Sequence, residues 1–382
     1  MADREPGAAM KMGVAPSLTT TPWQQVVLML SRVWAWAFLG LMIIFFVIAV
    51  PVASNGAVNF LTLRNSQNIL VAITPILLLG LGQTFVIISA GIDLSVGWVM
   101  SLASVLAALA IRAAYNGGAP LFLSVLIGFA AALAGACLVG LFNSVIIAKL
   151  KVPAFIVTLG SSFIVRGVAL LMSENTTVIG LPAGIRSYGN DALIYLIGGE
   201  GGGLYFLIRP EVSGDLLRRM DPIFPFPVVA TAIVVIIAIF LLRKTQFGRH
   251  TYAIGGSLEA AIRTGIPVER RFIQVYMLSA STAGIAGFLS TLRFTAGSAV
   301  IGDPLLLASI AAVIIGGVSL FGGAGTVMGT VIGALIIAVL TTGLVMLNVP
   351  SFWQFIVVGA VVILAVLIDQ SRDLIIGRGK AG

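Results

Sequence analysis

The chain has 382 residues, of which 59% are hydrophobic and only 9% charged, and its mean hydropathy is +1.11. A soluble globular protein is about one quarter charged, so these few charges exclude a water-soluble surface for a chain of this length. The formal net charge of +8 does not indicate nucleic-acid binding, because the basic residues gather between apolar runs. The composition predicts an integral membrane protein that has membrane lipid as its main solvent.

In chain order, residues 1–25 form a polar tail, and the first apolar run is long enough to span a membrane rather than to be cleaved as a signal peptide. Ten apolar runs of about 20 residues follow one another, separated by polar or Gly/Pro breaks. They lie at about 33–52, 68–89, 94–114, 121–147, 153–172, 224–242, 272–294, 304–320, 326–346 and 351–369. We predict an all-α fold with about ten transmembrane helices in a single domain, 26–372, and a tail over 373–382.

The basic residues predict the orientation. An even number of spans puts both termini on one side of the membrane. With the termini inside, 14 of the 22 Lys and Arg residues fall in inner segments, 7 fall in outer segments, and Arg166 lies within a span. Four of the seven outer residues lie in one long loop, and long loops carry less weight in this rule. We predict cytoplasmic N- and C-termini, an external loop at 173–222 and a cytoplasmic loop at 243–271.

A short pattern recurs in the two halves of the chain. Val152-Pro-Ala-Phe155 opens the fifth predicted span from the inside, and Val349-Pro-Ser-Phe352 opens the tenth from the outside. Glycine-containing breaks precede them at Gly91–Gly97 and Gly297–Gly302. Either the pattern recurs by chance in a chain of low complexity, or the domain consists of two inverted-topology halves with the transport pathway between them. We predict the second arrangement.

Asp93 is the only acidic residue between Glu5 and Glu174, and it lies between two apolar spans. A lone carboxylate in hydrocarbon costs about 3 kcal/mol or more, so it needs water, a cation or free backbone N–H groups. Asp93 or Ser95 can cap the helix that begins near Leu94. Two interpretations remain: a capped turn without a functional contact, or part of a pathway or its inner gate.

Other polar side chains fall inside the predicted spans. Most Ser and Thr residues in such positions bond to their own helix or to a neighbouring one. Arg166 can either extend to the interface or pair with Asp93. The residues that we predict at a pathway or gate are Gln83, Thr84, Asp93, Ser95, Asn143 and Thr158.

The loop at 243–271 is the most charged predicted cytoplasmic segment. Ser257 can cap a helix and Gly265 can stop it, which predicts a helix of about two turns. A helix this short is not stable alone, so either the membrane domain or a partner must hold it. The loop either enforces topology only or presents a docking element, and we predict docking. The predicted contact residues are Gly256, Glu259, Ala260, Ala261, Arg263 and Gly265.

Several chemistries lack their residues in this sequence. No G-x-x-x-x-G-K-[ST] motif is present, so we expect no ATP site in the chain itself. One histidine, His250, and one cysteine, Cys137, leave no metal site and no histidine-based triad, and we expect no cofactor. A transport subunit is therefore predicted rather than an enzyme.

Four stretches together resemble the membrane subunits of bacterial ribose/xylose/arabinose-type ABC importers. They are residues 83–97, 149–160, 248–265 and 310–323. The resemblance implies a permease subunit of the bacterial plasma (inner) membrane that carries a monosaccharide (a pentose, a hexose or a polyol). It also implies ATPase subunits, a second permease copy or a paralogue, and a periplasmic or extracellular sugar-binding protein. The Glu259–Gly265 segment resembles the coupling helix that sits in a cleft of the ATPase.

Two outer features depart from the family. The family usually has a Glu-Leu-Asp pattern where this chain has Leu306, Leu307 and Ala308, and the loop 173–222 is longer than expected. Charges at helical spacing in Ile208–Met220 predict a surface helix in that loop. The alternatives are an ABC permease for a branched-chain amino acid, a nucleoside or a furanose signal, and an ion-coupled secondary transporter. A scarcity of intramembrane acids disfavours the ion-coupled transporter.

Overall fold

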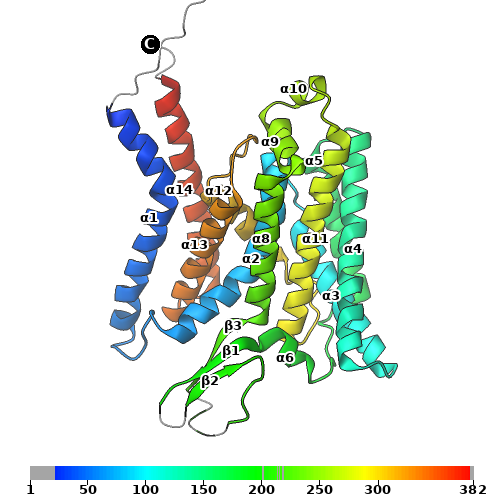
Figure 1. Cartoon of the computed structure of the whole chain (residues 1–382), viewed down its shortest axis with the longest axis vertical. Helices are drawn as coiled ribbons and strands as arrows, with labels where there is room; N and C mark the ends of the chain where they lie inside the picture. The colour runs from blue at the N-terminus through cyan, green and yellow to red at the C-terminus, as the bar shows by residue number, and fades with distance from the viewer. Residues whose placement is uncertain (1–21, 200–201, 213, 215, 217–218, 379–382) are drawn as a thin grey trace, which may run out of the picture.

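The computed structural model describes residues 22–378, except for 200–201, 213, 215 and 217–218. The described chain is a bundle of long helices with short elements at both ends (Figure 1). Eight helices are long and apolar enough to cross a membrane. They are α1 (Pro22–Ala53), α2 (Leu63–Ile88), α3 (Val96–Asn116), α4 (Leu121–Lys149), α5 (Ala154–Met172), α8 (Phe226–Lys244), α11 (Val268–Phe294) and α13 (Val327–Met346).

The two remaining apolar runs also form helices, α12 (Asp303–Ile315) and α14 (Ser351–Arg378). At 1.5 Å per residue, the 13 residues of α12 extend only about 20 Å, which is less than the hydrocarbon core. The helix ends at Ile315, and Gly317 forms a turn with a φ of +81°. The predicted span 304–320 therefore continued too far. The all-α membrane class is confirmed, and the count of about ten crossings stays a prediction.

The helices divide into an inner and an outer group. The apolar window of α2 is 89% buried, whereas those of α1 and α8 are each 22% buried. The exposed side chains of the outer helices are large and apolar, such as Ile236 and Phe240 on α8. An exposed apolar belt of this kind fits a lipid environment.

Small residues allow the inner helices to approach closely. A Cβ added at Gly82 in α2 would lie 2.6 Å from Thr282 Oγ1 and 2.7 Å from Ser279 Cα, both in α11. A Cβ at Gly287 in α11 would clash with the backbone of α3 at Met100. In lipid, close backbone approach of this kind replaces the hydrophobic effect as a source of helix association.

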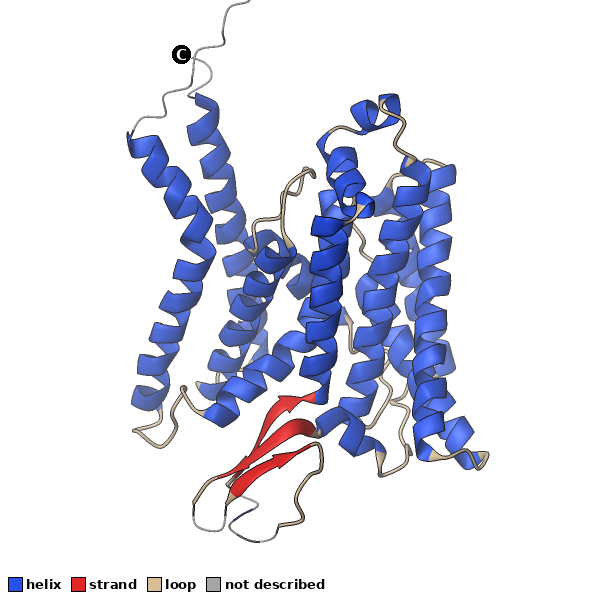
Figure 2. Cartoon of the chain, viewed as in Figure 1, coloured by secondary structure: helices blue, strands red, loops and turns tan. Residues whose placement is uncertain are grey.

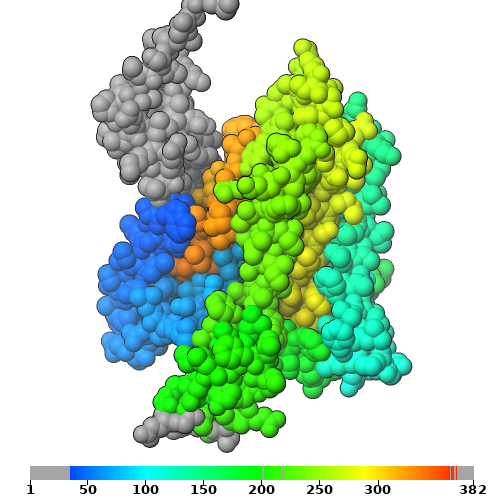
Figure 3. All heavy atoms as spheres, in the orientation of Figure 1, coloured from blue at the N-terminus to red at the C-terminus, as the bar shows by residue number. Residues whose placement is uncertain are grey.

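The two ends of the bundle differ (Figure 2). One end, the α10 end, carries α9 (Gln246–Gly256) and α10 (Leu258–Arg263). The other, the sheet end, carries α6 (Ile185–Asn190) and a three-stranded antiparallel sheet in the order β2-β1-β3. The strands are β1 (Ala192–Ile197), β2 (Gly203–Phe206) and β3 (Met220–Pro225). This sheet projects beyond the helix ends on the face shown in Figure 3.

The sequence did not predict this sheet. In the central strand, Tyr195 pairs with Tyr205 on one side and with Pro222 on the other. The helix predicted over Ile208–Met220 includes residues 213, 215, 217 and 218, which lie outside the described part of the chain. The predicted tail 1–25 is described only from residue 22, where α1 begins, and α14 continues to residue 378 within the predicted tail 373–382.

The recurring sequence pattern corresponds to recurring backbone conformations. Lys151 and Asn348, each directly before a Val-Pro pair, have φ values of +55° and +56°. α5 begins at the α10 end, whereas α14 begins at the opposite end and runs back to the α10 end (Figure 1). Ala90 after α2 and Thr295 after α11 also share a positive φ, +61° and +53°. These repeated features support the hypothesis of two inverted-topology halves.

Candidate functional site

The break between α2 and α3 is a buried turn. Ala90 adopts a left-handed conformation and the Gly91 amide donates to the Val86 carbonyl at 2.9 Å, which ends α2. A Cβ at Gly91 would lie 2.5 Å from the Tyr276 hydroxyl, so a larger residue here would displace the Tyr276 side chain. The turn holds Asp93 at the N-terminus of α3, where the helix dipole favours a negative charge.

Asp93 is 2% exposed, and three donors from the protein surround its carboxylate. The Ser95 amide and hydroxyl donate to Oδ1 at 2.9 and 2.6 Å, and the Ser279 hydroxyl of α11 donates to Oδ2 at 2.8 Å. The Ser95 side chain makes no capping bond of its own, so Asp93 is the capping side chain of the two proposed. Serine 279 was not predicted from the sequence.

Three further predicted residues converge on the same turn. The Gln83 amide nitrogen donates to the Asp93 carbonyl, and Asn143 Nδ2 of α4 donates to Ser95 Oγ at 3.0 Å. Thr158 Oγ1 of α5 bonds to the Ile92 carbonyl at 3.2 Å and to its own helix at Ala154. Elements α2, α4, α5 and α11 therefore meet at this turn. We name the set the Asp93 cluster, and its members are Gln83, Asp93, Ser95, Asn143, Thr158 and Ser279.

Two predicted polar residues lie outside the Asp93 cluster. The Thr84 hydroxyl bonds to the Gly80 carbonyl at 2.7 Å and to the Thr330 hydroxyl of α13 at 2.6 Å, so it joins two helices. Arg166 lies over the Trp98 ring, 4.7 Å from its centroid, a cation–π contact that neither proposed role included.

The polar groups around the turn are not fully satisfied by the protein. Among the described residues, Gln83 Oε1, Asn143 Oδ1 and the Tyr276 hydroxyl are buried and have no hydrogen-bond partner. Nearly all buried polar atoms in proteins have a partner, so three such atoms near one turn need an explanation. The helices around the turn, α2, α4 and α11, therefore retain two unused acceptors and one unused hydroxyl.

The predicted short helix forms as α10. The Ser257 hydroxyl accepts from the Ala260 amide at 3.3 Å, and Gly265 follows the helix with a φ of +78°. Glu259 and Arg263 form an i,i+4 ion pair at 2.6 Å, with both side chains 77% exposed. Of the six predicted contact residues, Ala261 is buried and the other five are exposed. Ala261 therefore marks the side of α10 that faces the protein, and α10 packs against α9.

α9 attaches this region to the Asp93 turn. A Cβ at Gly255 would lie less than 3.0 Å from the Ile88 carbonyl oxygen at the end of α2. The same carbonyl accepts from the Gly323 amide at 2.9 Å, and the Tyr252 hydroxyl donates to the Gly325 carbonyl at 2.7 Å. Gly255, which was not among the predicted site residues, is the glycine of the Gly255-Gly256 pair that makes the close contact.

His250 on α9 accepts a hydrogen bond at Nδ1 from Arg271 Nε at 3.0 Å. Burial, followed by the nearby positive charges of Arg271 and Arg249, lowers the pKa of His250 below its ordinary value. The neutral imidazole is therefore the form that fits this contact. Among the described residues, no group of three or more His, Cys, Asp or Glu side chains is arranged to hold a metal ion.

Comparison with known proteins identifies the family. A family model described as branched-chain amino acid transport system / permease component matches residues 65–366. The xylose transport system permease protein XylH of Haemophilus influenzae is 38% identical over 354 residues, covering 84% of this chain and 92% of that protein. This chain belongs to that family of permease components. The family predicted from the four sequence stretches is confirmed.

Two more relatives extend the comparison of this permease component. The D-allose transport system permease protein AlsC of Escherichia coli is 33% identical over 329 residues, covering 85% of this chain and 90% of that protein. The ribose import permease protein RbsC of Escherichia coli is 33% identical over 339 residues, covering 89% and 96%. No solved structure matches the chain. The eight candidate spans among the described residues of this chain are consistent with a multi-pass membrane protein.

Proposed function

We propose that this chain is the transmembrane permease subunit of an ATP-binding-cassette importer in the bacterial inner membrane. It translocates a monosaccharide or a related polyol that an external binding protein delivers, and separate ATPase subunits power it. The observation that carries the proposal is the 33–38% identity, over most of both chains, to permeases named for xylose, allose and ribose. The family description names branched-chain amino acids, so the proposal for a sugar depends on these relatives.

The geometry of α10 supports its role as the contact with the ATPase. Its ion-paired Glu259 and Arg263 side chains are exposed, while Ala261 is buried and α10 packs against α9. A short helix of this kind can transmit a displacement of the ATPase to the membrane domain, because it packs against α9 and leads directly into α11. Gly256 and Gly265 at its two ends complete the proposed docking segment.

The Asp93 cluster supports a place for the pathway or gate. It lies at the break between α2 and α3, where backbone groups are not used by helical bonds, and three other helices, α4, α5 and α11, meet there. Unused acceptors on Gln83 and Asn143 suit a solute rich in hydroxyl donors. The pathway role belongs to this cluster rather than to Thr84.

Transport by a reconstituted complex tests the proposal. The chain is co-purified with a candidate ATPase and a candidate binding protein from the same organism and placed in liposomes. Uptake of radiolabelled D-xylose, D-ribose, D-allose and L-leucine is then measured with and without ATP. ATP-dependent uptake of a sugar is expected. Uptake of leucine alone would show that the transported solute is an amino acid and not a sugar. Uptake driven by an ion gradient without ATP would refute the assignment to an ATP-binding-cassette importer.

The proposed assembly has a second permease, either another copy of this chain or a paralogue. The mass of the purified complex in detergent, measured by light scattering, distinguishes one permease from two. Mass spectrometry of the same sample then separates a homodimer from a heterodimer. A complex with a single permease would refute this part of the proposal.

A further inference from the structure

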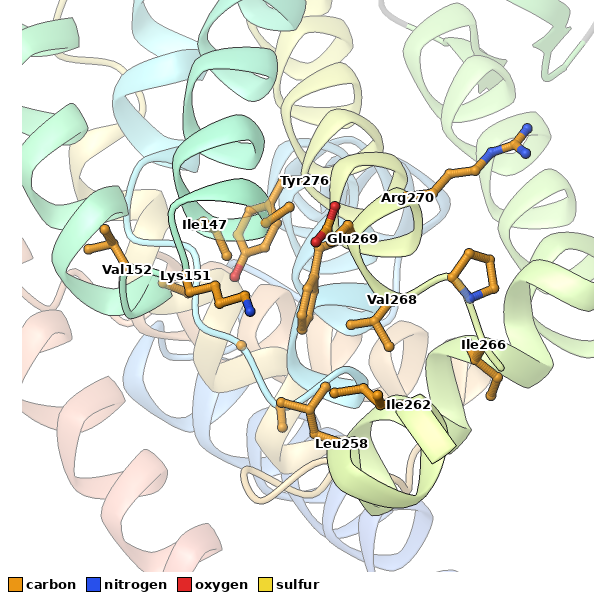
Figure 4. Close-up of a pocket in the computed structure, with 16 residues that line it drawn as sticks. Ile147, Lys151, Val152, Leu258, Ile262, Ile266, Val268, Glu269, Arg270 and Tyr276 are labelled. Carbon is orange, nitrogen blue, oxygen red and sulfur yellow. The ribbon is translucent and has the colours of Figure 1, made fainter. Parts of the chain in front are cut away.

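A cavity of about 760 Å³ lies at the α10 end, next to the Asp93 turn. Its walls come from the corner between α4 and α5, from α10 and from the first turns of α11 (Figure 4). Gly91, two residues before Asp93, lines its inner side. The volume falls within the range of about 300–1,000 Å³ that is usual for small-molecule sites. We name this space the α10 cavity.

One buried hydroxyl in the wall of the α10 cavity has no partner in the protein. The Tyr276 side chain is 1% exposed, its hydroxyl makes no hydrogen bond, and Figure 4 shows it directed toward the part of the cavity that Lys151 enters. A buried hydroxyl without a partner costs free energy, so the protein gains from any ligand that supplies one. Tyr276 is thus a polar anchor in the wall of the α10 cavity.

The charges of the α10 cavity are balanced. Lys151 on the α4–α5 corner and Glu269 on α11 bring one positive and one negative group to its walls, and no ion pair joins them in the described chain. Arg270, the third charged lining residue, extends away from the cavity in Figure 4. A donor, an acceptor and a hydroxyl between apolar walls suit a small neutral solute with several hydroxyl groups.

The position of the α10 cavity indicates its place on the transport route. It lies between the Asp93 cluster and α10, since Gly91 lines its inner side while Leu258 and Ile262 of α10 line its outer part. We infer that the α10 cavity is the vestibule through which a neutral, hydroxylated solute leaves this subunit, with Tyr276, Lys151 and Glu269 contacting its hydroxyl groups. The inference rests on the proposed function and adds a site and a solute class to it.

A cysteine placed in the vestibule tests this inference. In the complete complex, with Cys137→Ser as background, Val268→Cys is labelled with a bulky, water-soluble maleimide. Val268 points into the cavity in Figure 4. Phe155→Cys is the matched control, because Phe155 is 51% exposed, lies beside the lining residue Ala154 and does not line the cavity itself.

The labelled Val268→Cys complex is expected to take up D-xylose at least tenfold more slowly than the same variant unlabelled. ATP hydrolysis stimulated by the binding protein is expected to continue. D-xylose is also expected to slow the labelling of Val268→Cys and not that of Phe155→Cys. Unimpaired uptake by the fully labelled variant, or protection by L-leucine but not by D-xylose, D-ribose or D-allose, would overturn the inference.

A second variant tests the hydroxyl without relying on a new cysteine. Tyr276→Phe removes a buried hydroxyl that has no partner to lose, so the melting temperature is expected to stay the same or to rise. The sugar concentration that half-protects Val268→Cys is expected to rise about three- to tenfold, the loss of one hydrogen bond. Arg270→Gln, whose side chain points away, is the control. An unchanged concentration in Tyr276→Phe would remove Tyr276 from the site.

The two proposals fail in different ways. If the unlabelled wild-type complex takes up none of the three sugars with ATP, the proposed function is refuted. The inference about the vestibule, which depends on that function, is then refuted as well. If the wild-type complex transports a sugar and the labelled Val268→Cys complex transports it equally well, only the vestibule is refuted.

Discussion

The adjacent glycines Gly255 and Gly256 allow a matched test of how α9 is fixed to the helix break. A Cβ on Gly255 would lie less than 3.0 Å from backbone atoms of two residues, the carbonyl oxygen and carbon of Ile88 and the amide nitrogen of Gly323. Neither neighbour is a side chain, so no rotamer change can relieve the clash. A Cβ on Gly256 would meet nothing within 4 Å. One methyl group should therefore have opposite consequences at two neighbouring positions.

We expect Gly255→Ala to destabilise the protein by about 3 kcal/mol or more, because overpacking typically costs about 1–3 kcal/mol even where side chains can adjust. Gly256→Ala, within α9, should be neutral or stabilise by up to about 1 kcal/mol through helix propensity. Thermal unfolding of the purified chain in detergent, followed by intrinsic tryptophan fluorescence, gives the comparison.

Transport by the same two variants completes the test. Because the Gly255 contact joins α9 to the end of α2, its loss should also uncouple ATP hydrolysis from solute uptake in the reconstituted complex. Equal melting temperatures for Gly255→Ala and Gly256→Ala, or intact coupling in Gly255→Ala, would refute this account of the contact.

Substitutions at four further positions have expected outcomes. Asp93→Leu leaves three buried donors without an acceptor and should cost at least about 3 kcal/mol, whereas Asp93→Asn should cost less, since its amide oxygen can still accept; equal melting temperatures would contradict this. Glu259→Ala removes an exposed ion pair worth about 0.3–0.5 kcal/mol, so stability should hardly change while stimulation of the partner ATPase falls; unchanged stimulation would exclude the docking role. His250, whose pKa is lowered in the folded chain, takes up a proton first in the unfolded chain, so stability should decline as pH falls below about 6.5 and His250→Gln should flatten that decline. The measurement is the melting temperature between pH 7.5 and 5.5, and an equal decline in both proteins would assign it to other groups. Thr84→Val breaks a contact with Thr330 and should lower stability by about 1 kcal/mol without changing the solute concentration for half-maximal uptake; a changed concentration would return Thr84 to the pathway.

Patterns over many residues made the helices predictable. Each apolar run of about 20 residues corresponds to a helix, since lipid leaves few other ways to satisfy a backbone. The short α10 was also predictable, because Ser257 and Gly265 act through local capping and a local turn. These predictions depended on residues that are close together in the sequence, so the sequence alone was enough to make them.

Features that depend on contacts between distant segments were not predictable. Ser279 is an ordinary serine in α11 until the fold brings it, 186 residues away in sequence, to Asp93. Gly255 and Gly256 look alike in sequence, and only the position of Ile88 distinguishes them. The strands β1 to β3 are four to six residues each, too short for their pattern to stand out in an apolar chain.

The structure also changes how the two interpretations of Asp93 relate to each other. Its carboxylate is satisfied by three donors, so the capping role fully explains why a charge is tolerated there. Yet three buried atoms near the turn have no hydrogen-bond partner, Gln83 Oε1, Asn143 Oδ1 and the Tyr276 hydroxyl, and they belong to the helices packed around it. The capped turn can therefore stay fixed while the surrounding helices supply the polar contacts that change during transport. In that arrangement, movement of α9 and α11 relative to the turn would alter polar contacts without exposing the buried charge.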